Sequence, residues 1–81
     1  MGGGTVSRRS AVGFVSSSSV RTDVLHAVAE RPRTTENLIA AVDASESAVY
    51  DATAALERRD LLRSVGDGWA PTGSGRLVAD L

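Results

Sequence analysis

The sequence predicts a mainly α-helical fold with a small β-hairpin: a three-helix core, a two-stranded wing and a C-terminal helix. Residues 34–59 carry two short amphipathic helical patterns separated by a tight turn. Residues 62–71 follow directly and carry two short apolar runs around a glycine-rich turn, which is typical of a hairpin. The 81 residues suffice for one modest core, so we expect a single domain, which we place at residues 11–81. Residues 1–10, with three glycines and a polar run, are expected to be a flexible N-terminal arm.

The first long helix is predicted from about Ser19 to Arg31. Three glycines and a polar run precede it in the expected arm, and the apolar stretch 11–15 (AVGFV) reads as a short docked helix or turn. The serines at 16–19 supply the N-cap of the long helix, and Pro32 ends that helix. Its inward stripe, at i, i+4, i+7 and i+8, consists of Val20, Val24, Ala27 and Val28, with Leu25 at its boundary.

Two shorter helices then form a helix–turn–helix pattern. The hydroxyl of Thr34 or Thr35 caps the second helix, which buries Leu38, Ile39 and Val42. Asp43 and Ala44 make the turn, and Ser45 caps a third helix that continues to about Arg59. The inward positions of this third helix are Val49, Ala52 and Leu56.

Two short strands and a last helix complete the expected fold. The strands are residues 62–65 and 69–71, joined by Gly66-Asp67-Gly68, and Trp69 is expected to plug the core beneath the hairpin. Thr72 caps the last helix, whose packing residues are predicted to be Leu77, Val78 and Leu81.

The composition excludes several kinds of site. The chain has no cysteine, which rules out disulfides and thiol chemistry, and its single histidine, His26, cannot form a histidine-pair metal site. We find no paired acid and base, no activated nucleophile and no phosphate-loop motif, so we expect no enzyme, no cofactor and no small-molecule pocket. No run of about 18 apolar residues and no signal peptide is present, which predicts a cytoplasmic protein without a membrane span.

The charge pattern is unusual for a nucleic-acid binder. All nine basic residues are arginine, and ten acids bring the formal net charge to −1, whereas DNA-binding domains are usually basic. Such a lysine-free composition fits either a GC-rich genome or a salt-adapted cytoplasm, where screening over roughly 3 Å at 1 M salt makes net charge less decisive.

Three segments resemble winged-helix transcriptional regulators. The run from Leu56 to Leu62 (LERRDLL) resembles their EERGLV-type signature, and SESAVYDATAAL before it resembles their recognition helix. The run from Pro71 to Arg76 (PTGSGR) resembles the Thr-Pro-x-Gly-Arg start of their last helix. From about residue 14 to 81, the chain is similar to the MarR/ArsR-like winged helix-turn-helix regulators, particularly the short type of halophilic archaea. The resemblance implies sequence-specific binding of double-stranded DNA and transcriptional regulation, with a recognition helix at about 45–59 and a wing at about 62–71.

Two positions depart from the family pattern. Asp60 stands where these regulators usually have glycine, so an aspartate must adopt the left-handed conformation that ends the third helix. Gly73 stands where they usually have the proline that opens the last helix, which loosens that helix.

The candidate base-reading face is the side of the third helix that lies opposite its buried stripe. Small side chains there would let the helix enter a major groove, and Tyr50 would reach a phosphate or a thymine methyl group. The carboxylates of Glu46 and Asp51 oppose this interpretation, because they repel phosphate unless they accept from a cytosine amino group. The face consists of Glu46, Ser47, Tyr50, Asp51, Ala54 and Arg58.

The candidate phosphate contacts are hydroxyls at helix starts and nearby arginines. We expect them to be Arg33, Thr34, Thr35, Ser45, Ser47 and Arg63. A continuous arginine stripe from 33 through 58 to 63 would favour DNA, and its interruption by acids would favour the alternative, a winged-helix protein–protein adaptor without direct DNA binding. We expect a homodimer, for which the first helix with Leu25, the AVGFV segment and the last helix are the available surfaces.

Overall fold

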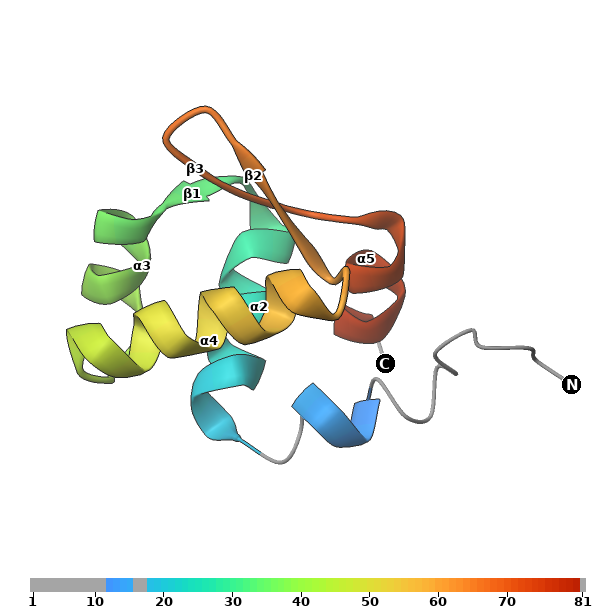
Figure 1. Ribbon diagram of the computed structural model, residues 1–81, viewed down its shortest axis with the longest axis horizontal. Coiled ribbons are helices and arrows are strands. Elements are labelled where there is room, and N and C mark those ends of the chain that lie inside the picture. Colours follow the sequence, from blue (N-terminus) through green and yellow to red (C-terminus); the bar gives the residue numbers. More distant parts are fainter. Residues whose placement is uncertain (1–11, 16–17, 81) are drawn as a thin grey trace, which may run out of the picture.

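The computed structural model describes residues 12–15 and 18–80 and is mainly helical, with a three-stranded antiparallel sheet (Figure 1). The expected arm over residues 1–10 and the predicted packing of Leu81 lie outside the described residues. Residues 12–15 are helical, as expected for the AVGFV segment. The other helices are α2 (Ser19–Glu30), α3 (Thr35–Ala41), α4 (Glu46–Arg58) and α5 (Gly73–Ala79), and the strands are β1 (Arg33–Thr34), β2 (Leu62–Val65) and β3 (Gly68–Pro71).

Each of these four helices begins at a hydroxyl N-cap, which explains why the sequence places the helix starts well. The Ser18 side chain accepts a hydrogen bond from the backbone N–H of Arg21 at the start of α2. Thr34, Ser45 and Thr72 cap α3, α4 and α5 in the same way. A short polar side chain satisfies a backbone N–H that no helical carbonyl can reach, so these boundaries are specified locally.

The core lies where α2 packs against α4, α5 and β3. Its largest fully buried side chains are Leu25, Leu38, Leu56, Leu61, Leu62, Val24, Val28 and Val49. Two expectations were wrong. Leu25 is 0% exposed and therefore cannot contribute to a dimer surface. It is buried because α2 packs against both α4 and α5, so a wider side of this helix is covered than the predicted stripe. Leu77, expected to pack, is 55% exposed, and Val78 is the buried residue of that pair.

The sheet contains one strand that the sequence did not reveal. Its order is β1-β3-β2, and both pairings are antiparallel. The β2–β3 hairpin turns through Gly66 and Asp67, with Gly66 at a φ of +56°, as glycine allows. Gly68, expected in the turn, instead begins β3 opposite Thr34. A Cβ atom at Gly68 would lie 2.4 Å from the Arg33 carbonyl oxygen, so β1 can approach only because residue 68 is glycine.

A compact junction connects the end of α4 to the start of α5. Asp60 has a φ of +60°, the left-handed conformation that the sequence predicted. The Thr72 hydroxyl donates to the Asp60 carbonyl oxygen at 2.6 Å and accepts from the N–H of Gly75 at 3.0 Å. Thr72 therefore caps α5 and ties it to α4 at once. None of the helices in the described part of the chain has the length and apolar character that a bilayer crossing requires.

Candidate nucleic-acid interface

The outer face of α4 is exposed largely as the sequence predicted. Ser47 and Asp51 are exposed, and Tyr50 is 53% exposed. These three residues lie on the side of α4 opposite the buried Val49 and Leu56. Ala54 was expected to be exposed but is half-buried. The neighbouring Thr53 is buried, with its hydroxyl donating to the Tyr50 carbonyl oxygen at 3.0 Å. The exposed part of this face is therefore the first two turns of α4, together with Arg58 at the end of the helix.

The predicted phosphate-binding hydroxyls are already hydrogen-bond acceptors. Thr34 Oγ1 accepts from Asn37 N at 3.0 Å, and Ser45 Oγ accepts from Ala48 N at 3.1 Å. Thr35 Oγ1 accepts from the indole Nε1 of Trp69 at 3.0 Å. A hydroxyl that accepts can still donate its own proton. Ser45 and Thr34 are exposed, whereas Thr35 is half-buried.

Arg33 occupies an internal position that does not support the predicted phosphate contact. Its guanidinium donates from Nε to the Ala27 carbonyl oxygen at 2.8 Å, from Nη1 to Asn37 Oδ1 at 2.9 Å and from Nη2 to Glu30 Oε1 at 2.7 Å. The side chain is 11% exposed. All three guanidinium nitrogens thus join α2 to β1 and α3, which leaves Arg33 little capacity to meet DNA.

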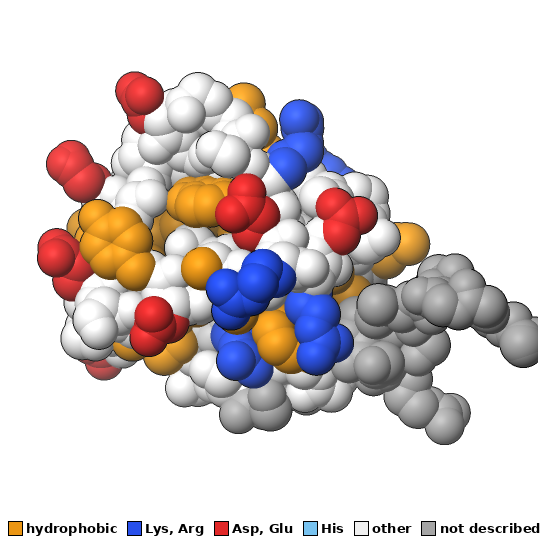
Figure 2. All heavy atoms as spheres, viewed as in Figure 1, with side chains coloured by type: hydrophobic (Ala, Val, Ile, Leu, Met, Phe, Trp, Pro, Cys, Tyr) orange, Lys and Arg blue, Asp and Glu red, His pale blue; other side chains and the backbone are white. Residues whose placement is uncertain are grey.

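The arginine stripe that would favour DNA is not continuous. Arg33 lies opposite Trp69, and Trp69 lies opposite Ser64 on the other side of β3. Opposed residues share a face of a sheet and successive residues alternate, so Arg33 and Arg63 project from opposite faces. Figure 2 shows acidic side chains spread over the visible face, including the half that carries the start of α4. Glu46 and Asp51 are both exposed on α4.

Basic side chains instead gather beside the C-terminal half of α4, around a hydrophobic group (Figure 2). Arg58 and Arg59, both exposed, end this helix. The guanidinium carbons of Arg59 and Arg21 each lie over the ring of Phe14, 4.1 Å from its centroid. Arg21 and Arg59 were not among the expected site residues. No periodicity connects positions 14, 21 and 59, so only the tertiary fold could bring these three residues together.

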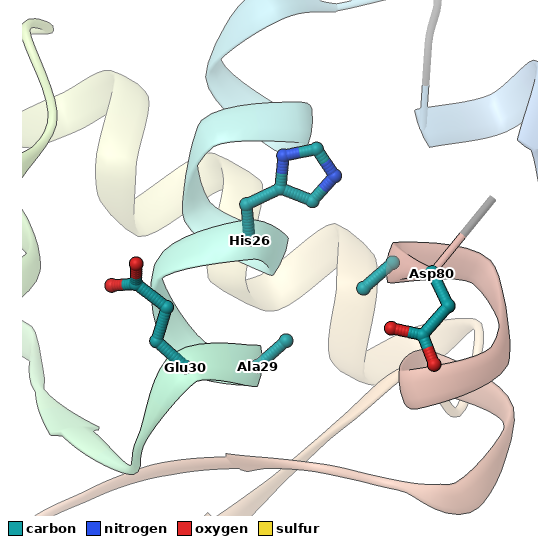
Figure 3. A pocket seen from close by; sticks show the side chains of 5 residues that line it. His26, Ala29, Glu30 and Asp80 are labelled. Atoms are coloured by element: carbon teal, nitrogen blue, oxygen red, sulfur yellow. The ribbon is translucent and has the colours of Figure 1, made fainter.

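His26 and Glu30 line a shallow hollow between α2 and α5, together with Ala29, Ala79 and Asp80 (Figure 3). The imidazole and the two carboxylates point in different directions in this view, and Glu30 is the ion-pair partner of Arg33. Within residues 12–15 and 18–80, no group of three metal-ligating side chains occurs. The hollow therefore has no arrangement that would hold a cation.

A family model described as the HVO_A0261 N-terminal domain matches residues 9–81. No curated protein matches the chain. No solved structure matches it either.

Proposed function

The chain belongs to the HVO_A0261 N-terminal domain family, and we propose that it binds double-stranded DNA as a winged helix-turn-helix protein. In this proposal α3 and α4 form the helix-turn-helix, α4 is the recognition helix and the β2–β3 hairpin is the wing. The element order supports it, since α3 and α4 pack together and the hairpin follows α4 directly. The exposed first two turns of α4 carry the proposal, because a free helix face of this kind is what enters a major groove.

The side chains on that face suit a groove. Ser47 is small and exposed, so it lets a helix backbone approach base edges, and Tyr50 provides a ring for a thymine methyl group or a hydroxyl for a phosphate. The N-terminus of α4, at Ser45, adds backbone N–H groups for a phosphate. By the resemblance to MarR/ArsR-like regulators, we propose transcriptional regulation by a homodimer, with two α4 helices about one DNA turn apart.

A pair of matched substitutions tests the role of α4. Ser47 and Ser74 are both exposed and are each the second residue of a helix, α4 and α5 respectively. Ser47→Glu places a new carboxylate in the proposed groove, so duplex affinity should fall at least tenfold. Ser74→Glu adds the same charge on α5 and should leave affinity unchanged. The measurement is fluorescence anisotropy with a duplex selected from a random pool. Equal affinities of the two variants would reject α4 as the recognition helix.

The interrupted arginine stripe favours a second candidate, a winged-helix adaptor that binds another protein. In this alternative Tyr50 is the anchor of the docking face, with Glu46 and Asp51 beside it to pair with a basic partner. The two candidates differ in one measurement. Salt screens both the attraction of arginines to DNA and the repulsion by Glu46 and Asp51, so a folded wild-type protein that binds no duplex anywhere between about 50 mM and 1 M salt would exclude DNA and leave the adaptor.

A further inference from the structure

We propose that Arg21 and Arg59, held against Phe14, bind phosphate groups of the DNA backbone. The inference rests on the proposed function and adds a contact site to it. Both guanidinium groups lie over the same ring, each with its carbon 4.1 Å from the ring centroid. The two carbons are therefore no further apart than twice that distance, and one stretch of backbone can meet both. We call Phe14, Arg21 and Arg59 the arginine clamp.

The ring holds the two arginines in place before any ligand arrives. A guanidinium stacks on an aromatic face through cation–π attraction and still presents its N–H groups at its edge. Arg21 is further fixed because its Nη1 donates to the Phe14 carbonyl oxygen at 3.2 Å. Phe14 is itself half-buried against the core. Side chains that are already ordered lose little entropy when they bind, which suits them to hydrogen-bond a phosphate.

The charge of the clamp favours an anion. Two positive groups held over one ring repel each other, and a bound phosphate would relieve that repulsion. The ion pair found in the described part of the chain is the one between Arg33 and Glu30, so no carboxylate there neutralises Arg59. Asp51 is the acid to consider, since it lines a shallow hollow together with Arg21, Ser18 and Ala48. This carboxylate opposes phosphate binding, so the site needs both arginines to attract an anion.

The position of the clamp fits a backbone contact rather than a base contact. Arg59 directly follows the last residue of α4, and the basic group lies beside the C-terminal half of that helix (Figure 2). Arg21 shares a hollow with Ala48 and Asp51 of the first half of α4, and Arg59 lies at the C-terminal end of that helix. If the first turns of α4 enter the groove, the pair would meet a DNA strand that runs beside the helix. Such contacts orient the protein and carry no sequence information.

The alternative is that the cation–π contacts only fasten residues 12–15 to α2 and α4. The two roles predict different results for substitutions that keep the fold. Arg21→Ala and Arg59→Ala should each weaken binding to a selected duplex and to a random duplex by the same factor. Each should also make the dependence of log affinity on log salt shallower by about one unit. Arg31→Ala is the matched control, because Arg31 is exposed and caps the opposite end of α2, ten residues and about 15 Å from Arg21.

Two further outcomes separate the clamp from the proposed function. If the wild type binds duplex DNA while Arg21→Ala and Arg59→Ala match Arg31→Ala in affinity and salt dependence, the clamp is wrong and the proposed function stands. If the folded wild type binds no duplex, the clamp is not a DNA site, and a titration with inorganic tripolyphosphate decides its chemistry. Shifts of the Arg21 and Arg59 side-chain N–H resonances would then make a free polyphosphate the ligand, and unshifted resonances would reject a phosphate site altogether.

Discussion

The indole Nε1 of Trp69 donates a hydrogen bond of 3.0 Å to Oγ1 of Thr35, which joins β3 to the first residue of α3. Two residues before Thr35, Arg33 pairs with Trp69 in the sheet. The same tryptophan thus holds β1 through the backbone and α3 through its side chain. Because α3 packs on α4, this contact sets the angle between the hairpin and the α3–α4 pair. Any surface that uses both elements depends on it.

Trp69→Phe should therefore lower the free energy of unfolding by about 0.5–1.5 kcal/mol through loss of this hydrogen bond, in addition to the effect of the smaller ring. A double-mutant cycle with Thr35→Ala isolates the bond, because the two substitutions remove the same contact. We expect the double variant to lose less stability than the sum of the single variants, measured by urea denaturation. Strict additivity would mean that the bond contributes nothing.

Arg33→Ala should destabilise the fold by about 1–3 kcal/mol, since it removes three charge-assisted hydrogen bonds at the junction of α2, β1 and α3. Arg31→Ala removes an exposed arginine two residues away and should change stability by no more than about 0.5 kcal/mol. Thermal denaturation of both variants makes the comparison. Well below its melting temperature, Arg33→Ala should bind DNA like the wild type. If Arg33→Ala lost DNA affinity without losing stability, Arg33 would be a DNA contact after all.

The sequence predicted those features that depend on neighbours along the chain. The hydroxyl caps at Thr34, Ser45 and Thr72 and the left-handed Asp60 all follow from local rules, and the structure confirms them. The exposed side of α4 follows from its apolar period, although Ala54 is more buried than expected because a helical wheel does not include the packing of neighbouring elements.

The features that the sequence did not reveal depend on contacts between distant elements. Strand β1 has two residues, too few for an alternating pattern, and it forms only because Gly68 lets it approach β3. Arg33 has Glu30 and Asn37 at spacings of three and four, a signal in the sequence that could have predicted internal hydrogen bonds instead of a phosphate contact. Its third partner, the Ala27 carbonyl oxygen, depends on how α2 ends. The arginine clamp combines residue 14 of the first short helix, residue 21 of α2 and residue 59, which follows α4, and no local sequence pattern connects these positions.

Two glycines of α5 should respond in opposite ways to the same substitution. A Cβ atom at Gly75 would lie 2.0 Å from the carbonyl oxygen of Leu61, so Gly75→Ala must push α5 away from the chain that follows α4. We expect a loss of roughly 1–3 kcal/mol in the free energy of unfolding. Nothing lies within 4 Å of the corresponding position at Gly73, and Gly73→Ala should be neutral or stabilise by up to about 1 kcal/mol. Circular dichroism melts of the two variants measure the difference, and similar melting temperatures would show that α5 shifts freely.

Asp60 should be a site where glycine stabilises the protein. A side chain at a φ of +60° is strained by its Cβ atom, and a carboxylate at the C-terminal end of α4 also faces the negative end of the helix dipole. The Asp60 carboxylate makes no hydrogen bond with any described residue, and the carbonyl oxygen that accepts from Thr72 is retained in any variant. Asp60→Gly should therefore raise the free energy of unfolding by up to about 1 kcal/mol, which for a domain of this size is a rise of about 4–8 °C in melting temperature. Asp60→Asn removes the charge and keeps the Cβ atom, so the difference between the two variants measures the strain at the Cβ atom minus the extra backbone entropy that glycine loses on folding. A melting temperature for Asp60→Gly no higher than that of Asp60→Asn would mean that the strain of the left-handed conformation is no larger than the entropy cost of glycine, and the predicted stabilisation would be wrong.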